Sequence, residues 1–191
     1  MQRIEAIAPR IKGRVLDIGH SVGTLHDEVS KRAKSSVGLD IVIKQHSGNA
    51  VKGDAECMPV KDRSFDVVLA GELIEHLCHP AEFLKECGRV LKKGGRLIIT
   101  TPNRDSLVNR LFKSYHAPAH LSLFNRKELE SLLGKSGFST KEFAMFPYTE
   151  ESSEGSKHKW FFLIRKAIHP FLPKFLQEEM LFITALDGNK T

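Results

Sequence analysis

The chain has 191 residues, a formal net charge of +6 at pH 7 and a sequence pI near 9.3. This length suits one domain and is too short for two full ones. The 29 basic residues are scattered among 23 acidic ones, which favours a solvated surface over a nucleic-acid interface. Cys57, Cys78 and Cys87 form no C-x-x-C motif, so the sequence indicates neither a disulfide framework nor a zinc site.

Targeting and membrane-spanning signals are absent from the sequence. Residues 1–14 include Arg3, Glu5 and Arg10 and lack the apolar core of a signal peptide. No stretch reaches the roughly 18 consecutive apolar residues of a transmembrane helix. We therefore expect a cytoplasmic protein that is either soluble or peripheral to a membrane.

The first predicted element is a strand over residues 14–18, and it leads into a turn rich in small residues. Gly19 and Gly23 lack a Cβ atom, so the backbone can turn tightly there and approach a ligand closely. Apolar residues at helical spacing follow, namely Leu25, Val29 and Ala33. A strand, a turn and a helix in this order are typical of the cofactor-binding corner of a doubly wound α/β sheet.

Further apolar runs alternate with helical patterns along the chain. The predicted strands that follow span residues 36–41, 50–54, 65–70 and 96–101. Helical segments between successive strands are typical of a parallel sheet with crossover connections. We therefore expect these strands to lie side by side and in the same direction.

Two helices carry clear start and stop signals. The first is predicted over residues 80–91, with a proline at its first position and Gly94-Gly95 as its stop. The second begins at Asn125, because Glu128 three residues later completes a capping box, and it is expected to end at Gly137.

The last part of the chain predicts two more strands and two long connections. Residues 139–146 and 179–186 are expected to pair as a hairpin-like edge. Connections 102–123 and 147–178 are long enough to form a lid or a substrate wall. The second connection is predicted to be a helical insertion. Its basic and apolar part, 157–176, either packs over the sheet edge or contacts an anionic membrane.

Acidic residues stand at the ends of four successive predicted strands: Asp17, Asp40, Asp54 and Glu72. Ligands of open parallel sheets bind beyond the carboxyl ends of the strands. Asp40 follows Asp17 by 23 residues, the interval typical of an acid that binds ribose hydroxyls. Several carboxylates around one site repel a pyrophosphate, which favours a neutral or cationic adenosine cofactor over NAD.

In their order and spacing, these motifs resemble the class I S-adenosylmethionine-dependent methyltransferases, especially the small-molecule type that includes the ubiquinone-biosynthesis O-methyltransferases. The resemblance runs from about Val15 to Phe146. The segments that carry it are Val15-Leu16-Asp17-Ile18-Gly19, Gly38-Leu39-Asp40, Gly53-Asp54-Ala55-Glu56, Phe65-Asp66-Val67-Val68, Glu72-Leu73-Ile74-Glu75-His76-Leu77, Leu91-Lys92-Lys93-Gly94-Gly95-Arg96-Leu97 and Thr101-Pro102-Asn103-Arg104. It implies a Rossmann-like, doubly wound, mostly parallel seven-stranded α/β sheet whose last strand is antiparallel. Together with the chain length, this predicts a single methyltransferase domain over 1–191.

The resemblance also implies S-adenosylmethionine as the cofactor and assigns residues to it. Gly19, Ser21 and Gly23 would pass beneath its methionine and ribose portions, and Asp17 would orient the methionine amino group. Ser21 departs from the family pattern, which usually has a glycine at this position.

The remaining cofactor contacts come from the later strands. Asp40 would accept hydrogen bonds from the ribose hydroxyls, and Asp54 with Ala55 would hold the adenine. Glu72 and Leu73 would line the far side of the cofactor.

Histidines are the candidate catalytic groups. Methyl transfer from a sulfonium needs mainly an aligned nucleophile and exclusion of water. A hydroxyl acceptor also benefits from a general base, for which His76, His116 and His120 are placed by position, although each is also compatible with a structural role. The neighbouring His76 and His79 lack a second ligand pair at metal-binding spacing, so no metal site is expected.

The sequence therefore predicts methyl transfer to a small-molecule acceptor, an oxygen nucleophile on a hydrophobic or lipid-linked molecule, without a nucleic-acid partner. Three alternatives stay open. The basic balance is compatible with an RNA or protein methyltransferase. The sequence identifies cofactor-binding residues more clearly than acceptor-binding residues, which is compatible with a non-catalytic S-adenosylmethionine sensor or partner subunit. A nicotinamide oxidoreductase is the third. The sequence does not determine the oligomeric state.

Overall fold

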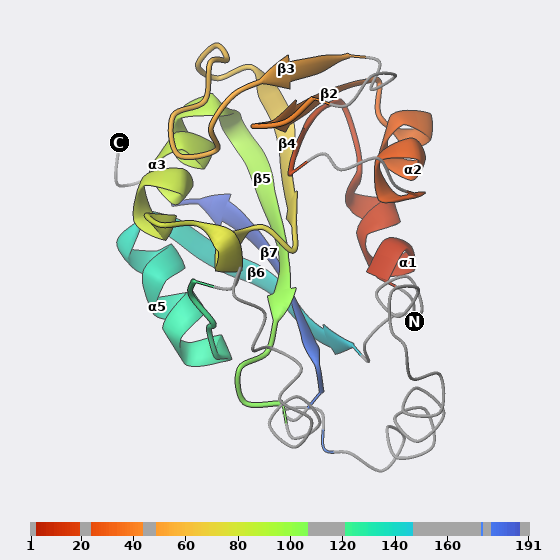
Figure 1. Cartoon of the computed structure of the whole chain (residues 1–191). Coiled ribbons are helices and arrows are strands. Elements are labelled where there is room, and N and C mark those ends of the chain that lie inside the picture. Colours follow the sequence, from red (N-terminus) through yellow and green to blue (C-terminus); the bar gives the residue numbers. More distant parts are fainter. Residues whose placement is uncertain are drawn as a thin grey trace.

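The computed structural model describes residues 3–19, 24–43, 49–106, 121–146, 173 and 177–187. Its centre is a seven-stranded sheet with the order β3-β2-β1-β4-β5-β7-β6 (Figure 1). The strands are β1 Arg14–Ile18, β2 Ser35–Asp40, β3 Ala50–Lys52, β4 Phe65–Gly71, β5 Leu91–Pro102, β6 Phe138–Phe146 and β7 Glu179–Leu186. All seven predicted strands are thus present, with ends that shift by a few residues.

Strand direction follows the prediction. Each neighbouring pair from β3 to β5 is parallel, whereas β7 runs antiparallel to both β5 and β6. The predicted pairing of the last two strands is confirmed, from Phe138 opposite Leu186 to Phe146 opposite Glu179. Strand β7 lies inside the sheet and β6 forms its edge, in line with a β7 that is buried along most of its length.

Helices cover both faces of the sheet (Figure 1). The helices are α1 Arg3–Ile7, η1 Ala8–Arg10, α2 Thr24–Arg32, η2 Ile74–His76, α3 Pro80–Val90 and α5 Arg126–Lys135. Alternate residues of β4 separate the two cores, because successive strand side chains point to opposite faces. Val68 and Ala70 pack in the core with α3 and α5, whereas Val67 and Leu69 pack in the core with α1 and α2.

The predicted helix 80–91 is confirmed to within one residue, whereas the strand that follows begins at Leu91 instead of the predicted residue 96. Helix α3 ends at Val90, and Leu91 already has extended backbone and pairs with Phe65. Gly94 and Gly95 form an irregular stretch inside β5, where φ of Gly94 is 77° and a Cβ on Gly95 would lie 2.9 Å from the Lys92 carbonyl oxygen. The glycine pair therefore permits a bulge and does not stop the helix.

The capping signals of the second predicted helix are confirmed. The Asn125 side chain accepts a hydrogen bond from the Glu128 backbone N–H at 3.0 Å, and the Glu128 carboxylate accepts one from the Asn125 N–H at 3.0 Å. Two of the donors at the helix start are thereby satisfied. Gly137, with φ of 83°, follows the helix at the predicted place.

The predicted insertion 147–178 and its segment 157–176 lie almost wholly outside the described residues, which include only 173, 177 and 178 of it. Across the described ranges, no helix is both long and apolar enough to cross a membrane.

An ion pair on α3 anchors the loop that follows β3. Arg89 Nε and Nη2 each donate to the Glu86 carboxylate at 2.7 Å, and Arg89 also donates to the carbonyl oxygens of Met58 and Val60 at 2.8 and 2.9 Å. Glu86 in turn accepts the Met58 N–H at 2.7 Å. The hydrogen bonds from Arg89 lower the pKa of Glu86 below its ordinary value of 4.5.

Replacing Glu86 by Gln is expected to lower the free energy of unfolding near neutral pH by about 1–3 kcal/mol, because the partly buried Arg89 loses one of its two carboxylate partners and keeps only Asp62. Since the folded-state pKa of Glu86 is lowered, its contribution is present above the ordinary carboxyl pKa and is lost as the pH falls below it. Urea unfolding at several pH values measures this, and the gap between wild type and E86Q is expected to shrink on acidification. The exposed Glu82→Gln is the matched control. An equal loss of unfolding free energy in both variants contradicts the stabilising role of the ion pair between Glu86 and Arg89.

Candidate functional site

A cavity of about 290 Å³ lies at the carboxyl ends of the first four strands. Its described lining residues are Ile18, Gly19, Leu39, Asp40, Ile41, Gly53, Asp54, Ala55, Glu56, Leu73, His76, Leu77 and Cys78. They follow β1, β2, β3 and β4 in turn. The parallel sheet thus brings to one cavity most of the described residues that the sequence singled out.

Two of the predicted acids face this cavity in similar turns. Asp40 Oδ1 accepts the Val42 backbone N–H at 3.0 Å, and Asp54 Oδ1 accepts the Glu56 N–H at 2.8 Å. A side chain that bonds the backbone two residues ahead is held in one orientation. Each carboxylate retains a second oxygen that is able to accept hydrogen bonds from a ligand hydroxyl or amine.

Gly19 has a backbone conformation and a close neighbour that both favour glycine at this position. Its φ of 76° lies in the left-handed region, and a Cβ there would lie 3.2 Å from Leu73 Cδ1. Its N–H donates to the Leu39 carbonyl oxygen at 2.9 Å. The predicted turn therefore begins at Gly19, whose backbone is hydrogen-bonded to the end of β2 and which places no side chain against Leu73.

Asp17, the first predicted acid, does not line the cavity and is only 5% exposed. Its Oδ2 lies 2.8 Å from Nδ1 of His26 on α2, so the imidazole N–H is placed to donate to the carboxylate. His26 Nε2 lies 3.2 Å from Ser30 Oγ, and Ser30 Oγ lies 2.9 Å from Ser36 Oγ. Sequence reasoning missed His26, whose only signal was its place in the first turns of the predicted helix.

The end of β4 has an unusual backbone. Glu72 has φ of 51°, a left-handed conformation that costs a non-glycine residue roughly 1–2 kcal/mol. Its N–H donates to the Thr100 carbonyl oxygen at 2.9 Å. Glu72 does not line the cavity, whereas Leu73, predicted with it, does. Such strain concentrates at functional sites.

His76 lines the cavity from η2, and the preceding residue holds η2 in place. Glu75 is fully buried, and its carboxylate accepts the Thr101 hydroxyl at 2.9 Å. Its backbone carbonyl oxygen accepts the N–H groups of Leu121 and Ser122 at 2.8 and 3.0 Å. The position of the candidate base therefore depends on a buried acid that the sequence reasoning did not single out.

Other predicted site residues cannot be placed. Ser21, Gly23, His116 and His120 lie outside the described residues. His79, the neighbour of His76 in the sequence, donates its backbone N–H to Glu56 at 2.7 Å. Within the described ranges, no group of three His, Cys, Asp or Glu side chains is suited to hold a metal ion.

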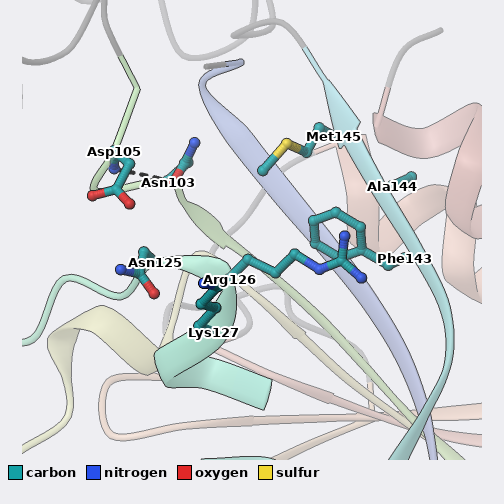
Figure 2. Close-up of a pocket in the computed structure, with 8 residues that line it drawn as sticks. All are labelled: Asn103, Asp105, Asn125, Arg126, Lys127, Phe143, Ala144 and Met145. Atoms are coloured by element: carbon teal, nitrogen blue, oxygen red, sulfur yellow. Dashed lines mark hydrogen bonds between the residues drawn. The ribbon is translucent and has the colours of Figure 1, made fainter. Parts of the chain in front are cut away.

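A second, larger cavity of about 780 Å³ lies between the loop after β5, the start of α5 and the end of β6. Figure 2 shows its described lining residues: Asn103, Asp105, Asn125, Arg126, Lys127, Phe143, Ala144 and Met145. Because β6 runs in the same direction as β5, this cavity opens at the same edge of the sheet as the first one.

The two cavities differ in charge. The described lining of the smaller cavity contains the carboxylates Asp40, Asp54 and Glu56 and neither lysine nor arginine. This lining disfavours a pyrophosphate and suits a neutral or cationic cofactor. The described lining of the larger cavity contains Arg126 and Lys127 against one acid, Asp105.

A methyltransferase-domain family matches residues 1–142. A probable S-adenosylmethionine-dependent methyltransferase of Mycolicibacterium smegmatis is 31% identical over 154 residues, which cover 72% of this chain and 57% of that protein. A ubiquinone biosynthesis O-methyltransferase of Paracidovorax citrulli is 30% identical over 120 residues, 54% of this chain and 49% of that protein.

The chain spans about half the length of these curated relatives. Among solved structures, a SAM-dependent methyltransferase from Archaeoglobus fulgidus matches with a TM-score of 0.72. That match covers 95% of this chain and 90% of the other at 24% identity, which shows a shared fold.

The contact between His26 and Asp17 is expected to stabilise the folded protein. His26→Leu is expected to lower the free energy of unfolding by about 1–3 kcal/mol, because it leaves a buried carboxylate without its donor. His26→Asn, whose side-chain amide also donates, is expected to retain part of this stability. Chemical denaturation of both variants measures the difference.

A double-mutant cycle with Asp17→Asn serves as the control for this prediction. If His26→Leu costs as much in the D17N background as in wild type, the two side chains are not coupled and the assigned contact is wrong.

Proposed function

Because the chain belongs to the methyltransferase-domain family, we propose that it transfers a methyl group from S-adenosylmethionine to a small-molecule acceptor. The observation that carries the proposal is the convergence of Gly19, Asp40, Asp54 and Leu73 on one cavity at the carboxyl edge of the sheet. These residues follow four different strands, so their meeting is a property of the fold and the motifs together.

The cavity suits the chemistry of this cofactor. In the proposal, the free oxygen of Asp40 accepts hydrogen bonds from the ribose hydroxyls, and Asp54 with Ala55 holds the adenine. Leu39 and Leu73 supply apolar surface, and the missing Cβ of Gly19 leaves room beside Leu73. Carboxylates in a described lining without lysine or arginine favour a cofactor with a positive sulfonium over one with a pyrophosphate.

In the reaction, the protein positions the acceptor and removes its hydroxyl proton. The bound cofactor supplies a methyl group already activated on a sulfonium. The protein orients the acceptor for in-line displacement and keeps water away, so most of the rate comes from alignment. In the proposal, an imidazole nitrogen of His76 takes the proton of an acceptor hydroxyl, with His116 and His120 as the other candidates for this role.

The acceptor class is the finer part of the proposal. We place the acceptor in the larger cavity, where Phe143 and Met145 offer apolar surface next to polar groups. A hydrophobic oxygen nucleophile fits this lining. The similarity to ubiquinone biosynthesis O-methyltransferases supports the same class of acceptor.

Cofactor binding is the first test. Isothermal titration of the chain with S-adenosylmethionine is expected to show binding, and Asp40→Ala is expected to weaken it by about tenfold or more because the ribose hydroxyls lose a charged acceptor. The exposed Glu82→Ala is expected to bind like wild type. Absence of binding to the wild-type chain overturns the proposal, and equal affinity of D40A and wild type removes Asp40 from the site.

Turnover separates an enzyme from a sensor that only binds the cofactor. Release of S-adenosylhomocysteine in the presence of a panel of phenols is the measurement. His76→Asn is expected to lower kcat by about 10²–10⁴-fold with little change in cofactor affinity. Cofactor binding without turnover on any acceptor favours the sensor, and an unchanged kcat in H76N assigns the base elsewhere.

A further inference from the structure

The larger cavity has two unlike walls. Phe143, Ala144 and Met145 lie along β6, Arg126 and Lys127 lie at the start of α5, and Figure 2 shows the Arg126 side chain reaching across to the Phe143 ring. Its volume of about 780 Å³ lies in the range of small-molecule sites. A ligand that fills it meets apolar surface and positive charge together.

Arg126 is held in a defined position between these walls. Its Cζ lies 4.0 Å from the centroid of the Phe143 ring, and its Nε donates to Glu130 Oε1 at 2.9 Å. Glu130 is the one carboxylate that contacts Arg126 in the described part of the chain. The terminal nitrogens Nη1 and Nη2 thus remain as a planar pair of donors, the geometry that carboxylates and phosphates match.

The acidic residues around Arg126 do not cancel its attraction for an anionic ligand. Asp105 lines the cavity, but Arg104 Nε lies 3.7 Å from it, and Arg104 Nη1 lies 2.8 Å from the Glu128 carboxylate. Lys127 is exposed, and no described carboxylate pairs with it. The side chain of Arg126 is 52% exposed, so both cations are accessible at the mouth of the cavity.

The backbone N–H groups at the start of α5 are not the groups that would attract an anionic ligand. The capping box between Asn125 and Glu128 already satisfies donors there. The cationic side chains, and not the helix end, are therefore the groups available to an anionic ligand.

The larger cavity is also tied to the smaller one. Glu75 accepts hydrogen bonds from Leu121 and Ser122, four and three residues before Asn125, which lines the larger cavity. The next residue after Glu75, His76, lines the smaller cavity. The residues that lead into the larger cavity are therefore hydrogen-bonded to the segment that carries the candidate base.

We infer that the larger cavity selects an acceptor that joins an apolar, ring-like body to an anionic group, with Arg126 and Lys127 binding the anion and Phe143 and Met145 the apolar body. This inference rests on the proposed function and specifies its acceptor. The anion is a carboxylate or a phosphate, since both match the fork of Arg126. The methyl-accepting oxygen then sits at the other end of the molecule, away from the two cations.

The test uses three probes of one shape: naphthoate, naphthyl phosphate and the neutral naphthylmethanol. Each is titrated by NMR into the whole chain with saturating S-adenosylhomocysteine, which keeps the probes out of the smaller cavity. Wild type is expected to bind at least one anionic probe about tenfold more tightly than the alcohol, and added salt is expected to reduce the gap. The better anion identifies the group that the cavity takes.

Variants then assign the preference to the two cations. Arg126→Gln combined with Lys127→Gln is expected to remove the preference for the anion and to leave binding of the alcohol within about twofold. Lys135→Gln, at the far end of α5, is the matched control and is expected to behave like wild type. Arg126→Lys, which keeps the charge but loses the fork, is expected to retain an intermediate preference.

Two outcomes overturn the inference: equal affinity of wild type for all three probes, or an anion preference that survives in the double variant. If the double variant does not fold, R126K and K127Q singly decide the question by the same comparison. Calorimetry with S-adenosylhomocysteine is run alongside. Failure of the wild type to bind it counts against the proposed function, whereas normal binding without anion preference counts against this inference alone.

Discussion

The buried carboxylate of Glu75 is the contact on which the arrangement of both cavities depends. It accepts the Thr101 hydroxyl at the end of β5, and its backbone carbonyl oxygen accepts two N–H groups of the segment that leads into α5. A fully buried acid is costly unless it is hydrogen-bonded, so these partners hold η2 firmly against β5. Because His76 directly follows, the same contact helps to position this candidate base at the smaller cavity.

The carboxyl edge of the sheet carries opposite charges along its length. Asp40 and Asp54 lie at the ends of β2 and β3, whereas Arg126 and Lys127 lie across the sheet near β6. A cationic cofactor and an anionic acceptor are drawn to opposite ends of such an edge. In the proposed function the two meet in the middle, after β4 and β5, where the backbone of Glu72 is strained. On that proposal the fold separates two binding tasks and leaves the chemistry between them.

Several elements were predictable because their signals are local. The capping box at Asn125 and Glu128 depends on residues three apart, and the strands show in apolar runs. The boundary between α3 and β5 was not predictable in this way. There Lys92 Nζ lies 2.8 Å from the Asp66 carboxylate and Leu91 pairs with Phe65, contacts that join distant parts of the chain and override a glycine pair that is locally a helix stop.

The amino-acid sequence by itself determined the order of strands and helices, the mostly parallel sheet, and the acids Asp40 and Asp54 at one edge, because alternation, caps and strand-end positions are written in neighbouring residues. Only the tertiary structure decided that Asp17 turns to His26 on α2 and that Glu75 joins three segments. It alone also brought Arg126 over Phe143 beside a large cavity. These contacts link residues whose separation along the chain carries no signal, and they exist only once the sheet has aligned its strand ends.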